Sequence, residues 1–288
     1  CILLNTPEHM GFFDPIKRGW KLSKLSWAVV KADPELMVYT IFSGIMFLMA
    51  MAMVYVPEIL EMSWTNDGNG NFTSAYFAWV FFCYMSASIF VVFWNCAIVA
   101  SAHERLMGGD PTFVSGIVNA SRHLPTIALW GVISGTVGLI LRALRMGASE
   151  RRDVFSQVLS FIAETAWWIM TFFIVPMIVI EGKGVKDSLS NSKSLFSQTW
   201  GESIGSGVGI TIIGVLFAIP AAIIGIFLMQ IDQLTGIITL VLLVGLIIIW
   251  VNTAESVSRA ALYMFAKTGE MPKLYQESGM NSYTFESD

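Results

Sequence analysis

Charged residues are scarce in this 288-residue chain. They make up 13% of the sequence, whereas hydrophobic residues make up 55%, and the mean hydropathy is +0.66. A soluble globular domain carries about 25% charged residues, so this chain has too few charges to cover the surface of a large water-soluble core. The composition therefore excludes an ordinary soluble domain and indicates a protein surrounded largely by lipid.

Cysteine and histidine are also scarce, with three of each. Cys83 and Cys96 lie on one predicted helix, about 20 Å apart along its axis, which is too far for a disulfide. His103 and His123 have neither a third ligand nor the spacing of a zinc motif. We therefore predict no metal site and no cofactor.

Motifs for catalysis and for nucleic-acid binding are missing. No Ser/His/Asp set is evident, and Gly182-Lys183-Gly184 lacks the remaining residues of a phosphate-binding loop. No basic cluster with interleaved aromatic residues is present, which excludes a nucleic-acid partner. We therefore predict no catalytic residue and expect a protein that is not an enzyme.

What the chain does contain is long apolar runs. Each is almost free of charge and long enough to cross about 30 Å of hydrocarbon as a helix. None shows the period-two alternation of a membrane barrel, so the predicted fold class is all-α, a polytopic transmembrane helical bundle with short amphipathic interfacial helices. The six predicted spans are residues 36–56, 75–102, 124–141, 154–180, 204–230 and 235–254.

These spans set the predicted organisation of the chain. Residues 1–9 are expected to be an upstream extension, because Met10 resembles a natural start. Residues 10–35 form a predicted cytoplasmic interfacial helix, 36–266 the six-span domain and 267–288 a cytoplasmic tail. We expect the last membrane helix to continue past Glu255 and Arg259.

The distribution of Lys and Arg predicts the orientation. With the N-terminus in the cytoplasm, most of the 17 basic residues fall in cytoplasmic segments, and the acidic first outer loop has none. We therefore predict a multi-pass protein of the cell (plasma) membrane with both termini cytoplasmic. One outer loop disagrees with this rule, because it contains Arg142, Arg145, Arg151 and Arg152.

The sequon Asn71-Phe72-Thr73 lies in the acidic outer loop and makes Asn71 a possible glycosylation site. Two other segments are amphipathic. Phe13, Ile16, Trp20 and Trp27 share a helical face beside lysines, as in a helix on an anionic inner leaflet, or else form only a basic lead-in. Val185, Leu189, Phe196 and Trp200 predict a cytoplasmic helix that packs on the bundle or on headgroups.

Polar residues inside spans are the best indication of a site, because hydrocarbon solvates them poorly. Glu164 is predicted near the middle of its span, protonated or paired with another helix. Asn252, Glu255 and Arg259 share one face of the last span. The candidate intramembrane polar site is therefore Glu164, Asn95, Asn252, Glu255 and Arg259. It is either a path for a proton or ion or a set of interhelical hydrogen bonds that fix packing.

Two small-residue motifs, Gly131-xxx-Gly135 and Gly205-xxx-Gly209, predict close helix packing, within the chain or across a dimer. Pro176 and Pro220 are expected to kink their spans or to end helices early.

Several blocks of residues are specific enough to suggest a family. They include Phe93-Trp94-Asn95, His103-Glu104-Arg105-Leu106, Gly108-Gly109-Asp110-Pro111-Thr112, Leu141-Arg142-Ala143-Leu144, Ala166-Trp167-Trp168 and Thr199-Trp200-Gly201-Glu202. Together with the flanking sequence from Phe12 to about Phe285, these blocks resemble a widespread prokaryotic membrane family, domain of unknown function six-one-five-nine. The resemblance implies six spans and no established activity, and it assigns no catalytic residue.

Three functions fit these features. The first is a non-enzymatic organiser of membrane lipid or of partner proteins, whose expected partners are the lipid bilayer, anionic lipids and other membrane proteins. The second is a small transporter or channel with a polar path through Glu164. The third is a membrane-embedded enzyme that modifies lipids, for which His103, Glu104 and Arg105 are the only candidate cluster.

Overall fold

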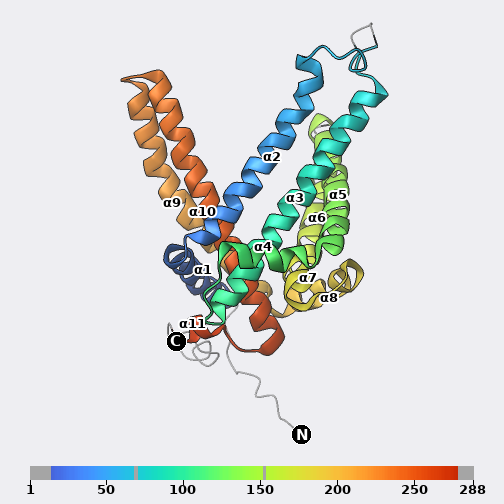
Figure 1. The fold of residues 1–288 in the computed structure, drawn as a ribbon. Helices are drawn as coiled ribbons and strands as arrows, with labels where there is room; N and C mark the ends of the chain where they lie inside the picture. The colour runs from blue at the N-terminus through green and yellow to red at the C-terminus, as the bar shows by residue number, and fades with distance from the viewer. Residues whose placement is uncertain (1–13, 68–70, 152–153, 278–288) are drawn as a thin grey trace. The chain divides into compact units, whose positions relative to one another are not determined.

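The computed structural model of the chain describes residues 14–67, 71–151 and 154–277, and helices account for most of them (Figure 1). The predicted all-α class is thus confirmed. The helices are α1 (Asp14–Ala32), α2 (Glu35–Ile59), α3 (Ser74–Leu106), α4 (Phe113–Ser121), α5 (Leu124–Arg151), α6 (Val154–Thr171), α7 (Ile174–Glu181), α8 (Val185–Gln198), α9 (Trp200–Met229), α10 (Gln233–Thr268) and α11 (Lys273–Glu277).

Within these ranges, six helical segments are long and apolar enough to cross a membrane. They are α2, α3, Leu124–Gly147 of α5, Val154–Glu181 (α6 and α7), α9 and α10. This agrees with the six predicted spans and makes the chain a polytopic helical membrane protein. The chain divides into two compact units. Unit 1 contains Cys1–Val38, Ser101–Phe113 and Ser194–Asp288, and unit 2 contains Tyr39–Ala100 and Val114–Lys193.

Two helices extend well beyond the predicted spans. α5 continues past Leu141 to Arg151, so Arg142 and Arg145 lie on a helix and not in the loop that the sequence predicted. Leucine, alanine, methionine and arginine, which favour helix, follow Leu141, and proline is absent there. α10 continues past Glu255 and Arg259 to Thr268, as predicted, and ends where Gly269 adopts a φ of 73°.

The predicted span 154–180 is interrupted between α6 and α7. Pro176 has no backbone N–H to donate to the preceding turn, which breaks the helical hydrogen-bond pattern. The backbone N–H of Phe173 donates instead to the hydroxyl of Ser192 on α8, at 3.1 Å. The expectation that Pro176 ends a helix early is confirmed, whereas α9 continues through Pro220.

The core of unit 1 begins where α1 packs on α9. A Cβ atom on Gly19 would lie 2.5 Å from the backbone nitrogen of Ser206 and 2.6 Å from the Cα atom of Gly205. One turn further on, Ser23 and Trp20 contact Gly209. The motif Gly205-xxx-Gly209 therefore packs within the chain, and its partner is the face of α1 that carries Gly19 and Ser23.

The aromatic face of α1 contacts protein. Trp27 stacks on Phe217 of α9, with 5.5 Å between ring centroids, and on Trp250 of α10, with 4.8 Å. The sequence left two interpretations of this segment open, a helix on the inner leaflet and a basic lead-in, and neither includes this contact. Helical spacing alone does not identify what an apolar face meets. Phe13 lies outside the described residues, and the side chain of Ile16 is not described.

The rest of this core is unusually polar. The hydroxyls of Ser206 and Ser258 share a hydrogen bond between α9 and α10, and Ser26 of α1 shares one with the buried Tyr275 of α11 at 3.0 Å. Residues 253–263 of α10 are almost all buried, whereas its apolar first half is largely exposed. The packed core thus lies at the end of the α9–α10 hairpin that is far from Asp232, and the exposed half meets lipid (Figure 1).

In unit 2, α5 packs against α3 through its own glycines. A Cβ atom on Gly131 would lie 2.7 Å from the Cα atom of Ile89, and one on Gly135 would lie 3.0 Å from Ser88. The Ser88 hydroxyl donates to the Gly131 carbonyl at 2.8 Å. Both glycine motifs are therefore used inside the chain.

The amphipathic α8 also has a protein partner. Val185, Ser188, Ser192 and Phe196 are buried, whereas Lys186 and Lys193 are exposed. Of the two alternatives for this segment, the structure supports packing on the helical bundle.

The α1–α9 packing gives the first prediction. Gly19→Ala is expected to destabilise the protein by about 1 to 3 kcal/mol, because the added methyl group meets backbone atoms that cannot move without shifting α9. Gly207→Ala is the matched control, because a Cβ atom there meets nothing within 4 Å. It should be neutral or stabilising by about 0.5 to 1 kcal/mol. Thermal unfolding in detergent measures both, and equal stability of the two variants would contradict the packing.

Candidate functional site

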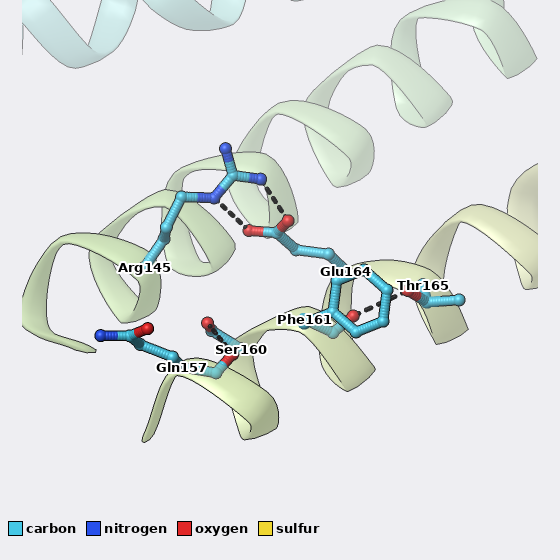
Figure 2. Close-up of polar contacts among 6 residues, drawn as sticks. All are labelled: Arg145, Gln157, Ser160, Phe161, Glu164 and Thr165. Carbon is cyan, nitrogen blue, oxygen red and sulfur yellow. Dashed lines mark hydrogen bonds and ion pairs between the residues drawn. The ribbon is translucent and has the colours of Figure 1, made fainter. Parts of the chain in front are cut away.

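A row of polar side chains runs along α6. Gln157, Ser160 and Glu164 follow one another at helical spacing, so they lie on one side of this helix (Figure 2). The Ser160 hydroxyl donates to the Gln157 carbonyl at 2.9 Å, which satisfies it within the helix. Glu164 remains as the one carboxylate of α6, about 15 Å along the helix from Val154.

Arg145 of α5 supplies the counter-charge for Glu164. Its Nε donates to Oε1 of Glu164 at 2.7 Å, and its Nη2 donates to Oε2, so the guanidinium and the carboxylate meet edge to edge (Figure 2). Such two-point pairs are the strongest charge-assisted hydrogen bonds between side chains. The Glu164 side chain is 24% exposed and that of Arg145 is 68% exposed.

The pair makes physical sense in a membrane helix. A single ionised side chain is poorly solvated by hydrocarbon, whereas two opposite charges in direct contact neutralise each other. The aliphatic stem of Arg145 also lets its head group reach across to α6. Deeper in the hairpin, Trp130 of α5 stacks on Trp167 of α6, with 5.8 Å between ring centroids. The hairpin is therefore fixed by an aromatic stack and an ion pair.

A groove of about 370 Å³ lies beside the ion pair, between α5 and α6. It is lined by small and apolar residues and by two serine hydroxyls. The lining residues are Ala143, Leu144, Gly147, Ser156, Leu159, Ser160 and Ala163. A site of this kind can hold part of a lipid chain or a few waters, and none of its described lining residues is charged.

The remaining polar candidates are distributed between the two units. Asn95 is half-buried on α3 of unit 2. Asn252, Glu255 and Arg259 lie on α10 of unit 1. The Asn252 amide donates to the Ile248 carbonyl at 2.8 Å, and Arg259 lies 3.9 Å from Glu255, one turn away. These residues thus form contacts along one helix, while Glu164 has its own partner in unit 2.

The cluster His103-Glu104-Arg105 at the end of α3 is built around Arg105. Its guanidinium lies 3.0 Å from the Asp110 carboxylate and 3.8 Å from that of Asp33. Burial raises the pKa of Asp33 above its ordinary value, and the positive charge of Arg105 acts in the opposite direction. Arg105 therefore joins the α1–α2 turn to the loop after α3. In the described part of the chain, no group of three or more His, Cys, Asp and Glu side chains could hold a metal ion.

Asn71 lies in the connection between α2 and α3. Its side-chain amide donates to Asp67 at 3.3 Å, and the hydroxyl of Thr73 donates to the Trp64 carbonyl. The side chain of Asn71 is exposed.

Arg145 was the residue that sequence reasoning missed as a functional partner. Glu164 was expected to pair with another helix, but the arginines before the α5–α6 turn were assigned to a loop. A signal was present, since Arg145 and Glu164 carry opposite charges on either side of the same turn. Placing Arg145 on a helix required knowing that α5 continues past Leu141.

The six apolar helices define an integral membrane protein, in which an ion pair joins two of the spanning helices. The comparison with protein families matches residues 74–272 to a family of unknown function (DUF6159). This match covers more than half of the chain, so the protein belongs to this family, as the sequence resemblance indicated. The match begins at α3 and leaves α1 and α2 outside. No curated protein matches the chain.

The ion pair gives the second prediction. Glu164→Gln and Arg145→Met each leave one charge without its partner, so each variant should melt at a lower temperature than the wild type. The exchanged variant Arg145→Glu/Glu164→Arg restores a pair and should recover much of the loss. Thermal unfolding in detergent provides the measurement, with Glu255→Gln as the control for a looser pair.

If the pair contributed nothing, both single variants would melt with the wild type. If the exchanged variant melted no higher than either single variant, the contact between the two side chains would not be the cause of the loss.

Proposed function

We propose that the protein is a non-enzymatic integral membrane protein that organises lipid or partner proteins around its helices. The observation that carries this proposal is that Glu164, the charge deepest in its span, is fully engaged by Arg145. Both oxygens of this carboxylate accept hydrogen bonds from the guanidinium of a neighbouring helix. Glu164 would have to break this pair before it could bind an ion or act on a substrate.

The other charged candidates support the same proposal. Glu255 pairs with Arg259, and Arg105 with Asp110 and Asp33. Charged groups that are used to join neighbouring turns and helices stabilise the fold. Each unit has a groove whose described lining residues are uncharged. Both grooves lie on membrane-spanning hairpins, which are surrounded by lipid.

We further propose that the protein lies in the plasma membrane of a prokaryotic cell, with both termini in the cytoplasm. The supporting observation is the excess of Lys and Arg in the segments that this orientation places inside. The arginines between the third and fourth spans are the one departure from this rule. For Arg145 the departure is reduced, because Glu164 neutralises its charge within the hairpin.

The third prediction tests the organising role. After extraction from native membranes in a mild detergent, the protein should retain a specific lipid, enriched over the bulk lipid of the same membranes, or a stoichiometric membrane protein. Mass spectrometry of the purified material identifies both. A stable, delipidated monomer without either would contradict the proposal.

Transport remains the second candidate, favoured by one observation. Two serine hydroxyls, Ser156 and Ser160, line the groove next to the Arg145–Glu164 pair, so that transient opening of the pair would place a carboxylate beside polar groups. A small transporter or channel would then use Glu164 as its gate.

The fourth prediction separates the two functions. In proteoliposomes loaded with a pH-sensitive dye, and in parallel with potassium and chloride probes, the wild type should give the same flux as protein-free vesicles. Glu164→Gln should change nothing, and Glu255→Gln serves as the control. Flux that Glu164→Gln abolishes and Glu255→Gln preserves would overturn the organiser role in favour of transport.

A further inference from the structure

Unit 1 contains a second groove, of about 260 Å³, on the α9–α10 hairpin. It lies where the packed core of this unit ends and the exposed, apolar half of the hairpin begins. Three helices of this unit contribute to it, namely α1, α9 and α10. The lining residues are Trp27, Phe217, Pro220, Ala221, Ile224, Leu243, Leu246, Ile247 and Trp250.

Trp27 and Trp250 form part of the lining of this groove. They are stacked on each other, and Trp27 is also stacked on Phe217. Their Nε1 atoms are buried within the protein, so the two rings offer the groove an apolar, aromatic surface. Tryptophans gather at the level of lipid headgroups in membrane proteins, which indicates that this groove lies close to the headgroups of one leaflet.

Two lysines lie on the same side of α1 as Trp27. Lys24 precedes it by three residues and Lys31 follows it by four, so the three side chains share a face. Both lysines are exposed, and the Nζ atom of Lys24 lies 5.4 Å from the ring centroid of Trp20. Positive charges beside an apolar groove at a membrane surface attract an anionic headgroup.

We propose that this groove binds one acyl chain of an anionic glycerophospholipid. The chain lies between α9 and α10 along Phe217, Ile224 and Leu246, and the phosphate lies near Lys24 and Lys31. This inference rests on the proposed lipid-organising function and names the lipid class. The groove is smaller than a pocket that encloses a drug-sized ligand, so it holds part of the lipid and leaves the headgroup outside.

The fifth prediction is tested first by a substitution that fills the groove. Leu246→Trp places a large ring in it, and Leu242→Trp is the matched control, one turn away on the same helix and outside the lining. The two positions are 50% and 67% exposed, so both substitutions are tolerable for the fold. The probe is palmitoyl-oleoyl phosphatidylglycerol added to the delipidated protein in detergent, and native mass spectrometry gives the bound fraction. Leu246→Trp should weaken binding about tenfold or more, and Leu242→Trp should bind as the wild type.

The second arm tests the headgroup. We expect the wild type to bind phosphatidylglycerol about fivefold or more tightly than phosphatidylcholine, because each lysine near a membrane surface attracts an anionic headgroup. In Lys24→Gln/Lys31→Gln this ratio should fall to about one. Native mass spectrometry again gives the bound fractions.

Equal effects of Leu246→Trp and Leu242→Trp on binding, with both variants melting as the wild type, would mean that the lipid does not occupy this groove. Equal binding of phosphatidylglycerol and phosphatidylcholine by the wild type would overturn the proposed anionic lipid class. Retention of a native lipid by Leu246→Trp would contradict this groove while the organising function stands. Flux through the wild type would contradict that function whether or not the groove binds lipid.

Discussion

Hydrocarbon offers no hydrogen-bond partners, and the rest of this structure depends on that constraint. Six segments satisfy it by forming helices, in which the backbone groups bond within the segment. Where a helix is interrupted, another group has to take over. Between α6 and α7 the hydroxyl of Ser192 accepts from the Phe173 N–H. A break caused by Pro176 is thus possible because a neighbouring helix supplies an acceptor.

The same constraint acts on side chains, and the two units meet it differently. In unit 2 a guanidinium and a carboxylate neutralise each other within one hairpin, beside a stacked pair of tryptophans. In unit 1 the spanning part of the α9–α10 hairpin is largely apolar, and two buried hydrogen bonds lie in the packed core at one of its ends. One joins Ser206 to Ser258, and the other joins Ser26 to Tyr275. Glycine allows this core to form, because a side chain at Gly19 would meet the backbone of α9.

The number of spans could be predicted because length and hydropathy are local properties of the chain. The prediction for Pro176 succeeded for the same reason, since the missing N–H belongs to the residue itself. The predictions for Trp27 and Arg145 required tertiary information. Helical periodicity shows that a face is apolar, but burial of such a face is favourable against lipid and against protein alike. The contacts of Trp27 with Phe217 and Trp250 were therefore not evident from the sequence. The pairing of Arg145 depended on where α5 ends, and helix ends are the least certain part of a sequence reading.

The contact of α1 with α9 joins residues that are far apart in the sequence, because Gly19 meets Gly205 and Ser206. During synthesis, α1 leaves the ribosome long before its partner. At about 5 to 20 residues per second, some 10 to 40 s separate their appearance, and four of the six spans are made in between. Throughout this interval the tryptophan face of α1 has no α9 or α10 to cover it, so a chaperone or the membrane surface has to shield it. The order of the chain thus makes α1 one of the last helices to reach its final packing.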